Sequence, residues 1–560
     1  MIISNIIIGS IIVIVFFIFY NLNQSYRLKK FKKVKETWGK GKDEYFQFDR
    51  IEQYNKLVNN KDFHTISNQT QIDIDFQDLF VYLDRTTSKV GQQFLYSQLL
   101  NPTNNINKLK EFGNQVEYFN KNSKDRDTIQ MKLFILSQGS SYSISNLFSD
   151  NIFQKPKWYN WVKLDLTITI LLLLFSIKFH FLLIWLMIPL FLNFVLHFWY
   201  KNRSINIVKT LPQLNLLINV SKFLKSKEFI KYEGDVSQSI TELKKFQSKL
   251  KYLNTGRLNT SVNVGSMNLG GDLGDLLYYF IDVVKGFFLI DFFIFFSSID
   301  DVLSKRKSVE NLFHFVGWVD SSISVSYIRE GDLITSEPEF ITNVKNIEFI
   351  DIKHPLIDNC VGNNLKIDGK SILITGSNMS GKSTFLRTIL INQLLSQTIF
   401  TTFTNSFKTS FLRIHSSIRI DDSLLDGKSY YFEEVNIVFN LLKQVETNDN
   451  LFVLDEVFKG TNTIERISSS KSILSFLNKS QNIVIVSTHD IELTTLLKNE
   501  FDLYHFSEDI NDDKLHFDHE LKVGELTTRN GIKLLEISNY PKEIIEESLS
   551  ISKTLRRYNE

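Results

Sequence analysis

A glycine-rich segment of this 560-residue chain has the residue types and spacing that bind the phosphates of a nucleotide. The two glycines of a G-x4-G-K-S segment let the backbone wrap a phosphate, and a following helix presents the positive end of its dipole. We expect Lys382 to neutralise the β- and γ-phosphates of ATP, and the Ser383 hydroxyl to ligate Mg²⁺. The loop consists of Gly376, Ser377, Asn378, Met379, Ser380, Gly381, Lys382, Ser383 and Thr384.

Two more apolar segments end in side chains that suit the hydrolysis of ATP. The run 451–454 is followed by Asp455 and Glu456, and the run 483–487 leads to His489. Asp455 can complete the Mg²⁺ shell, and Glu456 can orient and deprotonate the attacking water. His489 could sense the γ-phosphate. A solvated pair of acids and a structural histidine are the alternatives, which we favour less because all three residues would end strands of one sheet.

The elements around these residues predict an α/β domain. Residues 371–375 have the pattern of a buried strand, and residues 385–395 have the pattern of a helix. Strand, loop and helix therefore follow one another as the phosphate-binding pattern requires. From residue 340 onward, short apolar runs alternate with turns and polar helices. We expect the boundary of this domain near residue 345.

Charge and cysteine content exclude several other classes of protein. The chain has 64 Lys and Arg residues against 62 Asp and Glu residues, so any binding of nucleic acid must come from a local patch. Its single cysteine, Cys360, excludes a disulfide framework, a cysteine-based zinc site and a CxxC redox pair. The length suffices for about two to four domains.

The first segment of the chain predicts a membrane anchor. Residues 1–20 carry no charged side chain and are long enough to cross a bilayer as a helix. A cleaved signal peptide is the alternative, but no basic residue precedes the apolar run and no small-residue cleavage site follows it. The segment 21–76 begins with basic residues, which favour the cytoplasmic side. These are Arg27, Lys29, Lys30, Lys32, Lys33 and Lys35.

A second apolar block, at 164–199, predicts a transmembrane hairpin. Two short spans fit it, at about 166–177 and 181–198, with aromatic and basic residues on both flanks. A hairpin buried in a protein core is the alternative, because the first arm is short of a full span. With the anchor, we expect about three spans, a location in the cell (inner) membrane and a cytoplasmic ATPase domain. The stretch 276–296 is interrupted by charges and is interpreted as an amphipathic core helix.

Together, the loop lysine, the Asp-Glu pair and the strand-end histidine are those of an ABC-class ATPase, and their sequences resemble the MutS family. TGSNMSGKST at 375–384 is similar to the family's TGPNMGGKST. DEVFKGTNT at 455–463 resembles its DEIGRGTST, with Phe458 and Lys459 in place of Gly and Arg. STHDIELT at 487–494 resembles its ATHYHELT. The resemblance implies an ATPase that uses ATP and Mg²⁺.

Two further segments that resemble the family imply more contacts with ATP. The segment 350–356, IDIKHPL, resembles the family's RHP segment, which implies that His354 lies beside the adenine. Residues 419–434 are similar to the signature stretch that ends GRSTFMVE, which implies that Ser429 reaches the γ-phosphate held by a partner subunit. The resemblance therefore implies a homodimer formed through the ATPase domains.

The resemblance covers most of the chain and implies its domain organisation. Residues 83–102 resemble the opening of the family's core domain, and 517–531 with Tyr540-Pro541 resemble its C-terminal dimer-associated segment. We expect a multidomain protein. A helical MutS-type core and lever domain at 77–345, interrupted by the transmembrane hairpin, would be followed by an α/β P-loop (ABC-class) ATPase domain at 346–560.

Departures from the family leave two hypotheses for the role of the chain. Members that read mismatches carry two more N-terminal domains and a Phe-x-Glu wedge, whereas only 76 residues precede the expected core domain and none of them forms Phe-x-Glu. The first hypothesis is a membrane-anchored ATPase that binds mismatched or branched DNA in a repair or recombination role. The alternative is a membrane-tethered ABC-type switch that acts on a protein or envelope partner, with the mismatch function lost. Candidate contacts to DNA phosphates are Lys222, Lys225 and Lys227, with Lys244, Lys245, Lys249 and Lys251. The alternative is that these lysines only form solvated helix faces, which is the more common role of such charge runs.

Overall fold

A computed structural model describes most of the chain, in segments separated by short gaps. The expected anchor at 1–20, the basic residues after it and the first part of the stretch 276–296 lie outside the described residues. The described residues are 41–57, 63–148, 157–203, 205–254, 283–284, 286–341, 345–377, 379–419, 430–447, 449–511, 514–526, 535–536 and 540–559.

The chain folds as two compact units, and the sequence passes between them several times. The sequence predicted a single division near residue 345. Residues 60–84, which join the expected segment 21–76 to the expected helical domain, and residues 98–117 of that domain instead pack with the C-terminal unit. We call the first unit the helical unit (1–59, 85–97 and 118–324) and the second the sheet unit (60–84, 98–117 and 325–560).

The helical unit is built from α-helices and short 3-10 segments, and α6, α7 and α15 have residues in both units. Its elements are α2 (Phe48–Ile51), α3 (Gln53–Leu57), α6 (Lys89–Leu100), α7 (Ile106–Lys121), α8 (Ser123–Leu133), η1 (Phe134–Leu136), η2 (Gly139–Phe148), α9 (Tyr159–Ser176), α10 (Leu182–Arg203), α11 (Ile205–Lys225), α12 (Val236–Asn254), α14 (Ile290–Ser304) and α15 (Arg306–Arg329).

A buried carboxylate on α15 stabilises the start of α6. Asp320 accepts hydrogen bonds from the backbone N–H groups of Thr87 at 2.9 Å and Ser88 at 2.7 Å. The Ser88 hydroxyl oxygen accepts from the N–H of Gly91 at 2.9 Å and so caps the helix. Burial raises the pKa of Asp320 to about 6, although these hydrogen bonds act in the opposite direction. The N–H groups of Thr87 and Ser88 just before α6, and that of Gly91 in its first turn, thereby find partners inside the unit.

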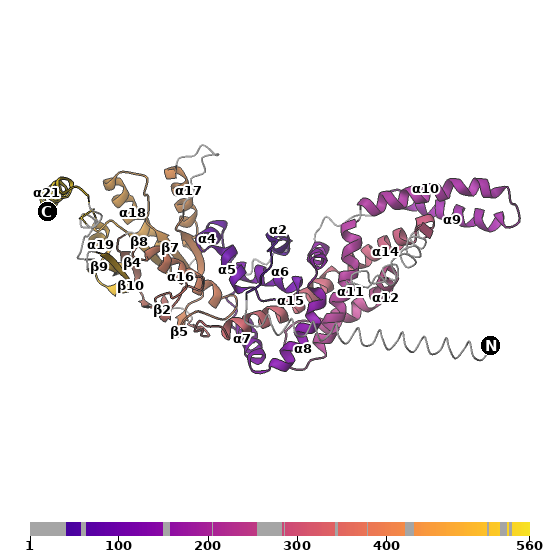
Figure 1. Cartoon of the computed structure of the whole chain (residues 1–560), viewed down its shortest axis with the longest axis horizontal. Coiled ribbons are helices and arrows are strands. Elements are labelled where there is room, and N and C mark those ends of the chain that lie inside the picture. Colours follow the sequence, from indigo (N-terminus) through magenta and orange to yellow (C-terminus); the bar gives the residue numbers. More distant parts are fainter. Residues whose placement is uncertain are drawn as a thin grey trace. The chain divides into compact units, whose positions relative to one another are not determined.

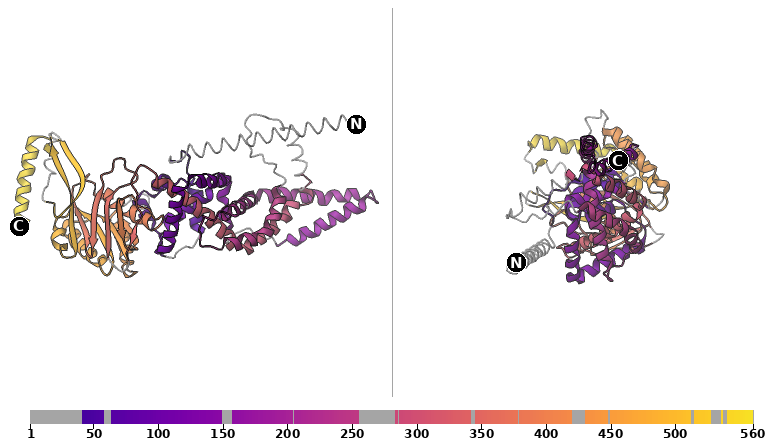
Figure 2. Two further views of the ribbon diagram at one scale, coloured as in Figure 1. Left: turned by 90° about the horizontal axis from the view of Figure 1, so that it is seen from below. Right: turned by 90° about the vertical axis from the view of Figure 1, so that its right-hand side faces the viewer.

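Helices α9 and α10 form a hairpin with an exposed apolar surface, and it extends away from the other described helices of its unit (Figures 1 and 2). Within the described part of the chain, one helix, Tyr159–Ser176, is long and apolar enough to cross a membrane, and only 17% of its residues are buried. Leu182–His197 is a shorter apolar helix. The expected number of about three spans is therefore not supported. The first arm is longer than predicted because α9 begins at Tyr159. Helix α10 runs to Arg203, but its apolar part, Leu182–His197, is shorter than α9.

The sheet unit contains two sheets whose strands lie side by side (Figure 2, left). Among the described residues, a six-stranded sheet has the order β10-β9-β4-β8-β7-β6, in which β10 is antiparallel to β9 and the other pairs are parallel. A four-stranded sheet has the order β1-β5-β2-β3. The strands are β1 (Glu339–Phe340), β2 (Asn346–Ile352), β3 (Asn363–Asp368), β4 (Ser371–Thr375), β5 (Ser406–Thr409), β6 (Arg413–Ser417), β7 (Asn450–Asp455), β8 (Ile483–Thr488), β9 (Phe501–Asn511) and β10 (Lys514–Val523). The helices are α4 (Asn68–Asp73), α5 (Phe76–Leu83), α16 (Lys382–Ser396), α17 (Tyr430–Leu442), η3 (Val445–Thr447), α18 (Thr463–Leu477), α19 (Glu492–Leu497) and α21 (Lys542–Asn559).

The three strands that the sequence predicted are neighbours in the six-stranded sheet. Thr375 of β4 is paired with Thr488 of β8, and Ser487 of β8 is paired with Asp455 of β7. Parallel strands end at the same edge of a sheet. The residues that follow β4, β7 and β8 are therefore brought to one edge, as expected.

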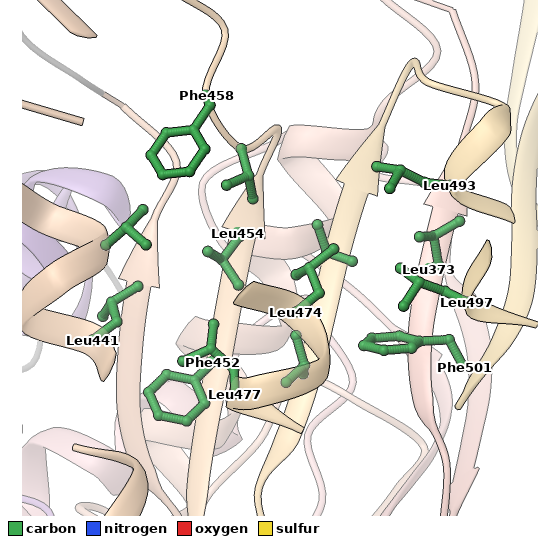
Figure 3. Packing of buried hydrophobic residues seen from close by; sticks show 14 of the residues in the cluster. Leu373, Leu441, Phe452, Leu454, Phe458, Leu474, Leu477, Leu493, Leu497 and Phe501 are labelled. Atoms are coloured by element: carbon green, nitrogen blue, oxygen red, sulfur yellow. The ribbon is translucent and has the colours of Figure 1, made fainter. Parts of the chain in front are cut away.

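An apolar cluster beneath this sheet holds the three strands in place (Figure 3). Side chains two residues apart, such as Phe452 and Leu454, lie on the cluster side of β7, and the intervening Val453 is equally buried on the other face. Strands covered on both faces have continuous apolar sequences. Helices α17, α18 and α19 supply six more members of the cluster, which are Val438, Leu441, Leu474, Leu477, Leu493 and Leu497.

Side chains from the upstream segment cover strand β6, which lies at one end of the six-stranded sheet. Nε2 of His64 donates to the carbonyl of Ile414 at 2.9 Å. Asp73 accepts from the backbone N–H groups of Ile418 at 3.1 Å and Arg419 at 2.8 Å, just after the strand. Burial lowers the pKa of His64 to about 4, which keeps the ring neutral. Polar groups along the outer side of β6 thus find partners in residues 64–73.

Candidate active site

The loop between β4 and α16 contains residues in the left-handed backbone conformation. Gly381 has φ of 108° and Met379 has φ of 72°, both in the left-handed region. A Cβ atom at Gly381 would lie 3.1 Å from Nδ1 of His519. Glycine is therefore favoured at 381 by both conformation and space. Helix α16 begins at the next residue, so its N-terminus points into the loop.

The Lys382 ammonium lies inside this loop. Its Nζ donates to the carbonyls of Gly376 at 2.8 Å and Ser377 at 2.7 Å, and it lies 3.4 Å from Nε2 of His489. Burial lowers the pKa of Lys382, while the neighbouring carboxylates oppose that change. A cation held close to the loop backbone is in position to meet a polyphosphate that the same loop binds.

The other predicted loop residues line the cavity or brace the loop. Ser377, Met379, Ser383 and Thr384 line the cavity described below. Ser380 is buried, and its hydroxyl donates to the carbonyl of Ser377 at 2.9 Å. Two predicted ATP contacts, Asn378 and Ser429, lie outside the described residues.

The two predicted Mg²⁺ ligands touch each other. The Ser383 hydroxyl donates to Asp455, and the Ser487 hydroxyl of the neighbouring strand donates to the same carboxylate. Among the described residues, no group of three or more His, Cys, Asp and Glu side chains could hold a metal alone. A hydroxyl beside one carboxylate fits Mg²⁺, which takes one or two protein ligands together with phosphate oxygens and water.

Glu456 lies between two nitrogen groups at the end of β7. Its Oε1 atom is 2.8 Å from Nε2 of His489, and its Oε2 atom is 3.5 Å from Nζ of Lys459. Burial raises the pKa of Glu456, but the His489 contact and the charges of Lys459 and Lys382 outweigh burial and hold the pKa below its usual value. The carboxylate is therefore ionised at neutral pH, as a general base must be.

A cavity of about 520 Å³ connects these groups. One wall consists of residues from the segment 352–361, including Ile357, Cys360 and Val361. His354, expected beside the adenine, lies behind this wall, and its backbone N–H donates to Sγ of Cys360 at 3.4 Å. Burial lowers the pKa of His354 to about 4. The structure thus brings Ile352 of the predicted segment and residues 357–361 to the cavity, but His354 does not line it.

A second histidine, which the sequence did not single out, also lines the cavity. Nδ1 of His519 lies 3.1 Å from the carbonyl of Ser380, and the residue has φ of 54°. The register of β10 against β9 shifts between Phe517 and Leu521. This bulge turns His519 toward the phosphate loop. Alternation along a strand does not reveal such a bulge, so only the residue type was available as a signal.

The fold and the site together define a P-loop ATPase domain. A parallel sheet carries the G-x4-G-K-S loop, the Asp-Glu pair and the histidine on adjacent strand ends around one cavity.

Comparison with known proteins supports the resemblance to the MutS family. Residues 372–556 match the family model of MutS domain V. Three similar proteins are each named DNA mismatch repair protein MutS. That of Thermus thermophilus is 29% identical over 203 residues, which cover 36% of this chain and 25% of the relative. That of Finegoldia magna is 31% identical over 222 residues, which cover 37% of this chain and 26% of the relative. That of Leptospira interrogans is 28% identical over 274 residues, which cover 45% of this chain and 31% of the relative.

The match of residues 372–556 to MutS domain V confirms the resemblance seen in the motifs. The chain spans about a quarter to a third of the length of the curated relatives it matches. The shared region contains Lys382, Asp455, Glu456 and His489.

Replacing Lys382 by alanine should raise the dissociation constant of ATP by at least about tenfold. A tenfold change corresponds to a loss of only about 1.4 kcal/mol of binding free energy. The loop would lose the cation that faces the phosphates. Titration calorimetry with Mg-ATP checks this. Lys366→Ala, at an exposed position of β3, is the control and should bind ATP like the wild type. Equal affinity of the Lys382→Ala and wild-type proteins would exclude the ammonium as a ligand.

Proposed function

We propose that the chain is a Mg²⁺-dependent ATPase of the MutS family that works as a dimer at a membrane and binds mismatched or branched DNA. The observation that carries the ATPase proposal is the contact of Glu456 with His489 beside Lys382, on the wall of the cavity that the phosphate loop lines. Those groups are the ones that ATP hydrolysis requires, and they come from three adjacent strand ends.

Each residue has a defined role in the proposed reaction. Lys382 and the loop N–H groups hold the β- and γ-phosphates, and Ser383 and Asp455 would hold Mg²⁺, which neutralises phosphate charge when bound. Glu456 accepts a proton from the attacking water, and His489 orients the Glu456 carboxylate through their 2.8 Å contact.

The dimer is proposed from the sequence around Ser429. In the sequence, residues 427–429 immediately precede α17, and we propose that Ser429 and the N-terminus of that helix meet a phosphate. In the family that this chain resembles, the corresponding serine serves the site of the facing subunit. A homodimer formed through the ATPase domains would complete each site in this way.

Support for DNA binding comes from the family and from a local cluster of charge. The relatives that match this chain are named as DNA mismatch repair proteins. At the end of α11, Lys225 is exposed, whereas Lys222 donates to Gln247 of α12. An exposed lysine at a helix end is suited to a phosphate contact.

A location in the cell membrane is proposed from the apolar hairpin. The exposed side chains of α9 and α10 are almost all aliphatic or aromatic, including Leu174, Phe175, Ile184, Trp185 and Phe191. Such a surface is unfavourable in water and stable among lipid chains. The anchor proposed at 1–20 and a cytoplasmic ATPase domain complete this arrangement.

The hairpin also favours a second candidate function. A membrane-tethered ABC-type switch, whose partner is a protein or the envelope, would need the same ATPase site and the same hairpin, but not a DNA contact. The response of the ATPase to DNA separates the two candidates.

Glu456→Gln should bind ATP with nearly wild-type affinity but hydrolyse it at least about 100-fold more slowly, because general base catalysis contributes that much or more. ATP should also accumulate dimers of this variant, which light scattering would detect. Phosphate release and titration calorimetry measure the two expected effects. Wild-type turnover by Glu456→Gln would remove Glu456 as the base, and a monomer at every ATP concentration would remove the dimer.

Mismatched or branched DNA should stimulate ATP hydrolysis by the detergent-solubilised protein more than the matched duplex does. Lys225→Glu should weaken that stimulation, and the effect should shrink as salt rises. Lys498→Glu, at an exposed position of the sheet unit, is the control of equal charge change. If no DNA alters the rate at low salt, the switch acting on a protein or envelope partner becomes the better description.

The topology can be tested with the single cysteine of the chain. A thiol reagent that cannot cross membranes should fail to label Cys360 in intact cells and should label it after lysis. In a Cys360→Ser background, His180→Cys at the hairpin turn should be labelled from outside, and Ser237→Cys in the helical unit should not. Protection of His180→Cys in intact cells would contradict a hairpin that spans the bilayer.

A further inference from the structure

The residue two positions after the proposed base has a backbone conformation that its side chain disfavours. Phe458 has φ of 62°, and Glu456 itself has φ of 59°. Only glycine adopts such values at little cost, because a Cβ atom crowds the following carbonyl. The family sequence DEIGRGTST has glycine at the position of Phe458. A phenylalanine here must be held by contacts of its own.

Those contacts join the loop after Glu456 to helix α17. The Phe458 ring is 6% exposed and belongs to the same apolar cluster as Val438 and Leu441 of α17 (Figure 3). It meets the Tyr431 ring edge-to-face, with centroids 5.8 Å apart. Gly460 also lies against α17, because a Cβ atom there would be 3.0 Å from Cβ of Tyr431.

A carboxylate on the same helix holds the backbone of this loop. Glu434 is 1% exposed, and its Oε1 atom accepts a hydrogen bond from the N–H of Lys459 at 3.1 Å. Burial raises the pKa of Glu434, and the N–H groups of Lys459, Phe458 and Gly460 act in the opposite direction. Helix α17 thus fixes residues 458–460 in two ways, by packing against the Phe458 ring and by the hydrogen bond from Lys459 to Glu434.

We propose that Phe458 and Glu434 are positioning residues that act through the backbone of residues 456–460 to hold the Glu456 carboxylate against His489. Neither side chain is among those that line the nucleotide cavity, so neither needs to touch ATP. The inference rests on the proposed role of Glu456 as the base. It assigns control of that base to α17, the helix that directly follows the Ser429 segment in the sequence.

Steady-state ATP hydrolysis by the full chain in detergent tests this assignment. Phe458→Gly keeps the left-handed backbone accessible but removes the anchor. We expect its kcat to fall about tenfold, with KM for ATP within about twofold of the wild type. Phe458→Leu retains an apolar anchor and should recover part of kcat. Phe439→Ala, which removes an exposed ring from the same helix, is the matched control and should keep the wild-type kcat.

Glu434→Gln provides a second test should Phe458→Gly fail to fold. It keeps an acceptor oxygen but loses the charge, and its kcat should fall several-fold without a change in KM. Combined with Phe458→Gly, it should lower kcat little beyond the single Phe458→Gly effect, because both act on one loop. A purely structural role would lower the melting temperature and leave kcat unchanged.

Glu456→Gln measured in the same series separates the two levels of inference. If Glu456→Gln is inactive while Phe458→Gly and Glu434→Gln have wild-type kcat, the positioning role is wrong and the base assignment stands. If Glu456→Gln turns over like the wild type, the base assignment itself is wrong. Loss of kcat at constant KM in both loop variants supports the positioning role.

Discussion

The parallel pairing of β4, β8 and β7 is the constraint on which the site depends. A strand pairs in parallel with its neighbour only at a fixed register, and here that register sets Thr375 beside Thr488 and Ser487 beside Asp455. Lys382 of the phosphate loop and His489 are 107 residues apart in sequence, and the shared sheet edge brings them together in space. A slip by one residue would turn every side chain of a strand to the opposite face.

Burial gives the charges at this edge their strength. The strands are apolar on both faces, so the groups at their ends lie beside a protein interior of low dielectric constant. In such surroundings the ionisation of each group depends strongly on the charged groups near it. Burial alone would favour a neutral Glu456 and a neutral Lys382. The charged groups at this edge counteract the effect of burial on the ionisation of Glu456 and Lys382. One cavity therefore keeps both a carboxylate that can accept a proton and an ammonium that can bind phosphate.

The sequence predicted the chemistry of the site better than its surroundings. The β4, β7 and β8 strands and the helix at Lys382 were predicted because continuous apolar runs and a glycine-rich loop are local patterns. His519 was missed because a bulge, which depends on pairing between two strands, directs it to the loop. The exchange of 60–84 between units was missed for the same reason, since it rests on contacts over more than 300 positions, such as that of Asp73 with Arg419.

The covering of β6 by residues 64–73 has a consequence for how the ATPase domain can be isolated. A strand at the end of a sheet presents backbone groups that can recruit a strand from another molecule. His64 and Asp73 occupy such groups with side chains of the same chain. A fragment cut at the motif boundary near residue 346 would leave this edge bare and prone to self-association, whereas one that retains the segment from residue 63 carries its own protection against aggregation.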